Sequence, residues 1–404
     1  MKYRRLILIL IITMMLFLQP SSMMRNENSI KQNADSALTI YTYESLLADP
    51  GYAYDRAFEQ YAGLPNGSVN VVLLDDAGSI LTKAVSEKAD PVADVLIGID
   101  NALVSQARQQ DILTPYQPKE ADKLVSGLVD GLASDYLLTP YDYGAIALWY
   151  LKQAFNSSID TSSLKLNDLL QNEVRNQLIV ENPNLSSPGL GFLLSTIAMF
   201  GDNAGVDSMI QGGWRDFWRQ LSDGTKLSPS WGDAISLLYT KEAKRSMMVS
   251  YSTSPAYGAC LYNDTSTAAV LPTINGTQYG WQQIEGLGVV KNAPHEALAK
   301  EFIDWFISEE LQSQIHLNQW MYPARAGITA PDCYDAAIDP STITPLNDRI
   351  PQNLLANNLT SWLDDWEVAW TEGTSGSFGL PFDTVGIFAT LILIPVLLRR
   401  KKEI

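Results

Sequence analysis

The chain has 404 residues, of which 46% are hydrophobic and 18% charged, a composition typical of globular proteins and unlike that of disordered ones. Its length exceeds what one hydrophobic core usually supports, so we expect two lobes. The 28 basic and 45 acidic residues give a net charge of −17, which would repel nucleic acid and anionic lipid. We therefore exclude a nucleic-acid partner. The charge favours cationic solutes at long range, although solubility is the simpler reason for it.

The basic N-terminal end of the chain and the apolar run that follows it predict export. Lys2, Arg4 and Arg5 precede an apolar run over residues 6–18, which is the layout of a secretory signal peptide and is too short to span a membrane comfortably. We assign residues 1–22 to this signal and residues 23–36 to a linker. No cysteine follows the run, so the lipid anchor of bacterial lipoproteins is not available.

The body alternates strands and helices. A β-rich run over residues 38–43 leads to a helix near 57–61 and to an almost wholly apolar strand over 69–74, and strand, helix, strand predicts a parallel sheet. The pattern repeats along the chain and indicates an α/β fold. Further expected elements are helices at 80–87, 100–107 and 163–170, strands at 93–99, 177–180 and 282–290, an amphipathic helix at 296–315 and a helical tail at 347–370.

The C-terminal end predicts a membrane anchor. A linker over residues 371–383 leads to an apolar segment over 384–398 and a basic tail over 399–404, which is a stop-transfer layout. The apolar segment is shorter than the ~20 residues that a straight helix needs. This end resembles the sorting tails of archaeal surface proteins. We therefore expect a protein held at the outer face of the cytoplasmic membrane by its C-terminal segment.

Histidine and cysteine are scarce. His295 and His316 have no partner at ligand spacing, so they predict neither a zinc cluster nor a histidine-based catalytic triad. Cys260 and Cys333 are the only cysteines. One disulfide and two unrelated thiols both remain open, and two thiols is the simpler interpretation. Six Asn-x-Ser/Thr sequons give weak support to a glycosylated exterior protein; they begin at Asn66, Asn156, Asn184, Asn263, Asn275 and Asn358.

Ser/Thr/aromatic clusters lie just beyond several expected elements, where α/β proteins place ligands. The clearest is residues 249–257, in which a strand-like run ends in four hydroxyl residues, a proline and a second tyrosine. Similar stretches occur at 41–45, 186–191 and 320–323. Taken alone, the first cluster is equally well explained as a surface loop.

Six such segments occur in the order found in one known family. They are LTIYTY at 38–43, DVLIGIDN at 94–101, PYDYG at 140–144, SPGLG at 187–191, SYSTSPAY at 250–257 and NQWMYP at 318–323. The chain resembles the thiamine-binding proteins of ABC importers over roughly residues 37–370. This resemblance implies an α/β, two-lobed type II periplasmic-binding-protein fold with a hinge.

The resembled fold gives the remaining domain bounds. Residues 37–143 would form the first part of lobe 1, 144–250 lobe 2, 251–336 the return to lobe 1 and 337–370 C-terminal helices across the lobes. The family pattern also implies a set of ligand contacts. These are Asp76, Ala77, Ser186, Ser187, Trp231, Tyr251, Ser252, Thr253 and Ser254, inside an aromatic wall of Tyr43, Tyr257 and Trp320.

These residue types suit thiamine, which presents a flat aminopyrimidine, a permanently charged thiazolium and a hydroxyl or phosphate arm. Aromatic faces stack on flat rings and attract cations. Ser187 as a helix N-cap with Pro188 at the first helical position would leave backbone N–H groups for a phosphate. Two departures from the family pattern are Pro50, which replaces a tryptophan, and Ala77, which replaces a glycine. The sequon at Asn184 adjoins this site, so we expect Asn184 to be unmodified.

The expected function is an exported receptor that captures thiamine or its mono- or diphosphate and delivers it to a separate ABC permease and ATPase. The chain lacks the phosphate-binding loop of ATPases and so does not power transport itself. We expect a monomer that uses no cofactor or metal and is not an enzyme. The alternatives are a receptor for a polyamine or for iron, and a thiaminase-like enzyme with Cys260 as nucleophile, which lacks a motif that would activate the thiol.

Overall fold

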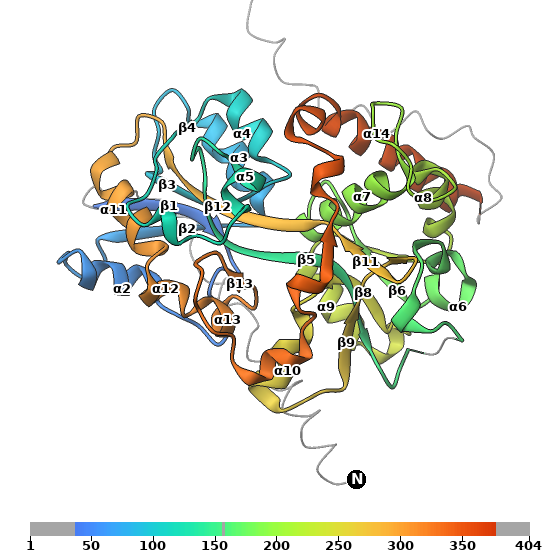
Figure 1. Ribbon diagram of the computed structural model, residues 1–404. Coiled ribbons are helices and arrows are strands. Elements are labelled where there is room, and N and C mark those ends of the chain that lie inside the picture. The colour runs from blue at the N-terminus through green and yellow to red at the C-terminus, as the bar shows by residue number, and fades with distance from the viewer. Residues whose placement is uncertain (1–36, 156–157, 377–404) are drawn as a thin grey trace, which may run out of the picture.

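The structure is a computed structural model that describes residues 37–155 and 158–376 (Figure 1). It contains two α/β lobes joined through the middle by β5 (Thr139–Leu151) and β12 (Gln282–Val290). The main sheet runs through both lobes in the strand order β2-β1-β3-β12-β5-β8-β6-β7. The expected two-lobed α/β architecture is therefore confirmed.

Lobe 1 is a mixed sheet covered by helices on both faces; β1, β2 and β3 are parallel, and β12 runs antiparallel to its neighbours. Its strands, besides the shared β5 and β12, are β1 (Leu38–Tyr43), β2 (Val69–Leu74), β3 (Val95–Asp100), β4 (Leu113–Thr114) and β13 (Tyr322–Pro323). Its helices are α2 (Tyr54–Tyr61), α3 (Ala77–Ser86), α4 (Val104–Gln110), α5 (Leu128–Leu132), α11 (Glu296–Phe306), α12 (Glu309–Gln312) and α13 (Ile315–Asn318), with a 3-10 turn η2 (Ala121–Lys123). Phe58, Phe302 and Trp305 pack together in the core of one face, and Ile80, Leu96 and Leu138 lie in the core of the other.

Lobe 2 continues the sheet with β8 (Met247–Tyr251), β6 (Leu178–Glu181) and β7 (Lys226–Ser228), which are mutually parallel, and with β9 (Thr267–Val270) beside β5. Its helices are α6 (Asn172–Arg175), α7 (Ser187–Phe200), α8 (Trp214–Ser222), α9 (Trp231–Tyr239) and α10 (Ser254–Tyr262), with 3-10 turns η3 (Thr161–Ser163), η4 (Leu166–Leu170) and η5 (Lys241–Ala243). A small second sheet consists of β10 (Thr273–Ile274), β11 (Thr277–Gly280) and β14 (Ile343–Pro345).

The C-terminal part of the described chain returns over lobe 2. It includes the 3-10 turns η6 (Asp332–Ala336), η7 (Pro340–Thr342) and η8 (Asn347–Arg349) and the long helix α14 (Gln352–Gly376). Trp366 and Trp370 of α14 pack against Trp218 of α8. Near its start, Gln352 hydrogen-bonds to Ser105 of α4 in lobe 1, so α14 contacts both lobes.

Several expectations about helices are wrong. The helix expected over 100–107 begins at Val104, because Asp100 ends β3, and the one expected over 163–170 is the two 3-10 turns η3 and η4. The single helix expected over 296–315 is broken after Phe306, where side chains bind the backbone carbonyls: Gln312 donates to Phe306 O at 3.2 Å and Arg325 donates to Ile307 O at 3.1 Å. Residues 371–376, expected to begin a flexible linker, are the end of α14, where Thr374 donates its hydroxyl to Trp370 O at 3.3 Å.

The other terminal predictions fall outside the described residues. They are the signal at 1–22, the linker at 23–36, the remaining linker at 377–383, the anchor at 384–398 and the tail at 399–404. Within the described part of the chain, every helix is too short or too polar to cross a lipid bilayer.

Candidate ligand-binding site

Strands of the two lobes end close to one another. In lobe 1, β1 ends at Tyr43 and β3 ends at Asp100, and in lobe 2, β8 ends at Tyr251. The hydroxyl of Ser187, at the start of α7 in lobe 2, is close enough to the Asp100 carboxyl to lower its pKa. The carboxyl ends of strands from both lobes therefore meet, which is where open α/β sheets bind ligands.

Three carboxyl groups, Asp100, Asp142 and Glu285, are buried at this meeting point, and we call them the acidic centre. Their exposed fractions are 2%, 0% and 7%. Asp142 on β5 lies directly opposite Glu285 on β12, next to a register shift between Glu285 and Gly286. The described residues include no lysine, arginine or histidine among the groups that shift the pKa values of these carboxyls. The acidic centre is thus a buried cluster of acids without a basic partner among the residues that the structure describes.

Tyrosine and glutamine side chains surround Glu285. The Tyr43 hydroxyl donates to Glu285 Oε2 at 2.5 Å, and the Tyr141 hydroxyl contacts the same oxygen. Gln283 Nε2 donates to Glu285 Oε1 at 2.6 Å, and Gln319 Nε2 donates to the Tyr43 hydroxyl at 2.7 Å. The carboxyl is therefore held by donors from β1, β5 and β12, and Tyr43 is held in turn by the segment after α13.

Burial raises the pKa of all three acids, because a charged carboxylate is poorly solvated inside the protein. The pKa of Asp142 lies well above its ordinary value, and the facing Glu285 raises it further, while the Gln319 amide acts in the opposite sense. The pKa of Asp100 rises to about 7 despite hydrogen bonds from the backbone N–H groups of Ala102 and Leu103. Burial also raises the pKa of Glu285, and its tyrosine donors offset part of the rise. A cation at this position would reverse these shifts.

Trp231 and Tyr251 form an aromatic pair on the lobe 2 side, with ring centroids 6.4 Å apart. Trp231 Nε1 donates to Ser250 Oγ at 2.9 Å, and Ser250 Oγ lies 2.7 Å from Ser254 Oγ. The Tyr251 hydroxyl lies 3.2 Å from Gln283 Nε2, and Gln283 also contacts Glu285. Hydrogen bonds therefore connect this pair to the acidic centre.

Tyr257 on α10 and Trp320 after α13 form a second aromatic pair, which we call the rim pair. Their rings meet edge to face with centroids 5.0 Å apart. Both bind the same lobe 1 residue: the Tyr257 hydroxyl donates to Asp49 Oδ2 at 2.5 Å, and Trp320 Nε1 donates to Asp49 O at 2.7 Å. Gln319, next to Trp320, connects the rim pair to Tyr43.

The remaining candidate residues lie at helix starts or below the surface. Ser186, not Ser187, is the N-cap of α7, and its buried hydroxyl makes no hydrogen bond within the described structure. Ser252 and Thr253 are fully buried. Asp76 caps α3 by accepting from Ser79 N at 2.6 Å, with Ala77 the first helical residue. The N-terminus of α3 is thus already capped by a carboxylate, which makes it a poor place for a phosphate.

Several residues in this network were not among the candidates taken from the sequence. They are Asp49, Asp100, Tyr141, Asp142, Gln283, Glu285 and Gln319. Asp100, Tyr141, Asp142 and Gln319 lie inside the segments that carry the family resemblance. Glu285 had its own signal, because it is the one charged residue of a strand that is buried almost throughout. A carboxylate in such a strand needs a functional or structural explanation.

The two cysteines form a disulfide, with Cα atoms 5.0 Å apart, so the interpretation as two unrelated thiols is wrong. Sequence separation gave no indication of it, because the bond joins α10 to the distant turn η6. A disulfide-bonded sulfur is not a free thiolate, so Cys260 cannot act as a nucleophile in this state.

Comparison with known families identifies the class of protein. Residues 44–313 match the family described as bacterial extracellular solute-binding protein. The chain belongs to this family. It is accordingly a binding protein and not an enzyme, and its ligand is bound as cargo and not as a cofactor.

Individual relatives carry more specific names than the family does. The chain is 29% identical over 339 residues to a thiamine-binding periplasmic protein of Salmonella typhimurium, covering 83% of this chain and 94% of the relative. It is 27% identical, with the same coverage, to one of Escherichia coli. A solved structure titled periplasmic thiamin binding protein superposes with a TM-score of 0.69 at 26% identity, covering 82% of this chain and 96% of that one.

Other solved structures share the fold alone. A ferric binding protein from Campylobacter jejuni superposes with a TM-score of 0.65 at 17% identity, over 82% of this chain and 98% of that one. At this identity the similarity supports the two-lobed fold and gives no information about the ligand.

The expected location is wrong. We expected an archaeal-type protein anchored at the outer face of the membrane, whereas the matched relatives are named periplasmic proteins of bacteria. No helix of the described residues supplies a membrane span, and the segment proposed as the anchor lies outside them.

Proposed function

We propose that the protein is an exported receptor that binds thiamine, or its mono- or diphosphate, between the two lobes and delivers it to a separate ABC permease and ATPase. The observation that carries this proposal is the acidic centre beside aromatic side chains from both lobes. A flat ring system with a permanent positive charge fits such a site. The names of the matched relatives support the same ligand.

Charge and aromatic faces would act on different parts of the ligand. Asp142 and Glu285 would attract the thiazolium, which has no hydrogen to donate, so the interaction would be electrostatic. Trp231 and Tyr251 would stack on the rings, and each cation–aromatic contact contributes about 0.5–2 kcal/mol. Micromolar binding requires about 8 kcal/mol, so several of these contacts must act together.

The phosphate arm would bind at the start of α7. The first N–H groups of a helix have no partner within it, and the positive end of the helix dipole faces an anion there. The buried, unpaired hydroxyl of Ser186 lies at this terminus. This position also makes a glycan at Asn184 unfavourable. A glycopeptide map in which Asn184 is fully occupied would contradict the proposed arm position.

Calorimetry of the purified protein tests the proposal. Thiamine, thiamine monophosphate, thiamine diphosphate and spermidine are titrated in turn, and at least one thiamine form is expected to bind with micromolar or tighter affinity. The order of the three thiamine forms reports whether the α7 terminus accepts phosphate. Absence of binding by all three would refute the proposal. Spermidine is included because the acidic centre would also attract ammonium groups; a clear preference for it would favour a polyamine receptor.

A ferric ion is the second candidate. The Tyr43 and Tyr141 hydroxyls lie 2.8 Å apart and both contact Glu285, and hard oxygen donors of this kind suit Fe³⁺. Among the described residues, no group of three or more His, Cys, Asp or Glu side chains could hold a metal, so a ferric ion would depend on the two tyrosines. Titration with ferric citrate separates the two, because iron bound by tyrosinate gives a visible charge-transfer band.

Export by residues 1–22, a monomeric state and glycans at exposed sequons such as Asn263 are further parts of this proposal. Mass spectrometry of the mature N-terminus, light scattering and glycopeptide mapping test them separately.

A further inference from the structure

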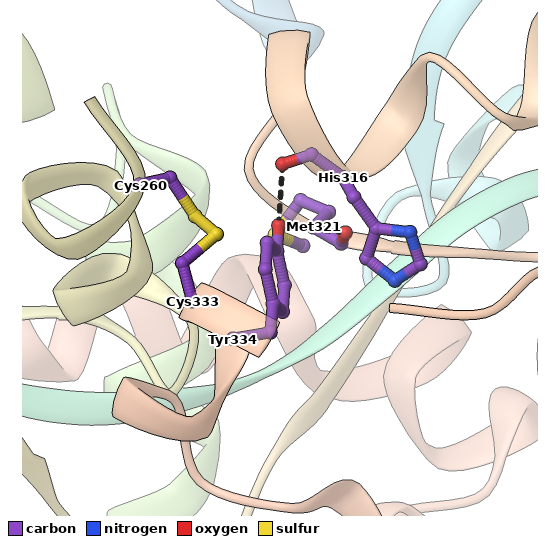
Figure 2. Close-up of a disulfide and its surroundings, with 5 residues drawn as sticks. All are labelled: Cys260, His316, Met321, Cys333 and Tyr334. Carbon is purple, nitrogen blue, oxygen red and sulfur yellow. Dashed lines mark hydrogen bonds between the residues drawn. A yellow bond between two sulfur atoms is a disulfide. The ribbon is translucent and has the colours of Figure 1, made fainter. Parts of the chain in front are cut away.

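The disulfide is linked to both members of the rim pair, to Tyr257 through α10 and to the backbone beside Trp320 through Tyr334. Cys260 is on α10, three residues after Tyr257, and residues three apart are neighbours on a helix surface. The disulfide joins Cys260 to Cys333 in η6. The next residue, Tyr334, extends its side chain alongside the disulfide to the backbone of His316 in α13 (Figure 2).

Tyr334 holds the backbone on both sides of Trp320. Its buried hydroxyl lies 2.7 Å from His316 O and 3.2 Å from Met321 O, and its ring meets the His316 ring edge to face at 4.7 Å. Trp320 itself has a left-handed backbone, with φ of 62°. This conformation is costly for a residue with a side chain and persists only where the surroundings fix it. Tyr334 is placed to fix it, since its hydroxyl contacts the backbone before and after Trp320.

These contacts form a closed ring of interactions that includes both lobes. Tyr257 is linked along α10 to the disulfide, and the disulfide is linked through Tyr334 to Met321. Trp320, next to Met321, contacts Tyr257 edge to face and closes the ring. α10 connects β8 to β9 of the lobe 2 sheet, whereas α13 and β13 belong to lobe 1. A change at the disulfide would therefore alter the relative position of the two rim aromatics.

We infer that Cys260, Cys333 and Tyr334 are positioning residues for ligand binding: they hold the rim pair, Tyr257 and Trp320, in place over the site. This inference rests on the proposed function, because it takes the rim pair as part of the thiamine site. None of the three residues needs to touch the ligand. Their effect is on how long the bound ligand is retained.

The first test compares affinities in a double-mutant cycle. Cys260→Ser with Cys333→Ser should weaken thiamine binding about tenfold, mostly through faster dissociation, measured by stopped-flow fluorescence. Tyr334→Phe, which keeps the ring and the disulfide, should weaken it about threefold. In a Trp320→Ala background both effects should disappear, because the side chain that they position is gone.

A general loss of stability would give a different result. Leu359→Ala in the lobe 2 core should lower the melting temperature without changing the thiamine dissociation rate. An unchanged dissociation rate in both the cysteine and Tyr334 variants, or an equal loss with and without Trp320, would overturn the inference. If the cysteine variant does not fold, the Tyr334→Phe cycle decides the question alone.

A second measurement does not depend on the ligand. The protein is labelled with 5-fluorotryptophan, and the Trp320 resonance is assigned by Trp320→Phe. The cysteine variant should shift or broaden this resonance and leave those of the core residues Trp218 and Trp366 unchanged. If the wild-type protein does not bind thiamine, the proposed function fails while this spectrum still tests the positioning. A Trp320 resonance identical in both forms would refute the positioning, whatever the protein binds.

Discussion

The acidic centre and the aromatic pairs differ in what holds their side chains in place. Asp100, Asp142 and Glu285 are almost fully buried on the strands of lobe 1 and the connecting strands. The aromatic side chains are partly exposed, and each pair is completed by two different elements, which in the rim pair are far apart in the chain. Selection for positive charge is therefore built into the sheet, whereas selection for a flat shape depends on contacts around the meeting point of the lobes.

The two regions also differ in their relation to stability. Burial of a carboxylate without a basic partner costs free energy, and two facing acids add a repulsion. Stacked aromatics stabilise the chain that carries them. The acidic centre is thus an arrangement that folding does not favour. We expect a bound cation to offset this cost. Removing a charge from the acidic centre should therefore lower ligand affinity but raise stability, whereas removing an aromatic side chain should lower both.

The largest effect is expected from Glu285→Gln. This change removes a buried charge and keeps the shape of the side chain, so thiamine affinity should fall about a hundredfold, while the melting temperature of the ligand-free protein should rise. Calorimetry and thermal unfolding measure the two quantities. Glu301→Gln, on the exposed face of α11, is the matched control and should change neither. Equal affinities for the two variants would show that the acidic centre does not select the ligand.

Trp231→Ala should weaken binding about tenfold, because it removes an aromatic face from a partly desolvated cation. Trp231→Phe keeps a ring, loses only the hydrogen bond to Ser250 and should have a smaller effect. Tyr239→Ala is the control on the same helix; Tyr239 is 46% exposed, and its removal should leave affinity unchanged. If the alanine variants at 231 and 239 bind equally well, α9 does not contribute an aromatic face to the site.

The pH dependence of binding tests Asp100. Its pKa of about 7 in the free protein means that this carboxyl gains its charge as the pH rises through about 7, so affinity for a cation should increase, by about tenfold between pH 6 and 8. Stability should change in the opposite sense. The folded chain holds this proton more tightly than the unfolded chain, whose Asp pKa is 3.8, so this contribution to the free energy of unfolding is lost as the pH rises from about 4 to about 7.

Asp100→Asn should flatten both profiles, in calorimetry and in thermal unfolding across the same pH range. An affinity that stays constant from pH 6 to 8 in the wild-type protein would contradict a role for this carboxyl in attracting the ligand.

The smallest effect is expected at the link between the two regions. The Tyr251 hydroxyl lies 3.2 Å and 3.5 Å from the two polar atoms of the Gln283 amide, which indicates a weak hydrogen bond. Tyr251→Phe keeps the ring and should reduce affinity less than about threefold, again by calorimetry. A loss as large as that of Trp231→Ala would mean that the hydroxyl itself binds the ligand, and the separation of charge from shape would have to be revised.

Local pattern was sufficient to predict much of the fold. The strands at 69–74 and 282–290 have the expected bounds, because β-branched residues, which favour strands, occur along both stretches. The breaks in 296–315 could not be predicted, since they depend on Gln312 and Arg325 reaching carbonyls brought near by folding.

The candidate site, like the fold, could be predicted from the sequence only in part. Hydroxyl and aromatic residues at element ends were visible in the sequence because their positions repeat a family pattern. The acidic centre was not, because its contacts are long-range: Tyr43 and Glu285 are 242 positions apart. A lone acid in an otherwise uncharged strand predicts burial of a charge, but its partners appear only when β1, β5 and β12 are placed side by side.

The position of Asp142 and Glu285 on the two strands that join the lobes has a consequence for the order of events. When two rigid bodies swing about a pair of connecting strands, atoms on those strands move least. The charged groups should therefore keep their arrangement in an open form in which the aromatic pairs are separated. A cation would first be attracted by electrostatics alone and be enclosed afterwards, so its arrival rate should depend strongly on salt and its departure rate hardly at all.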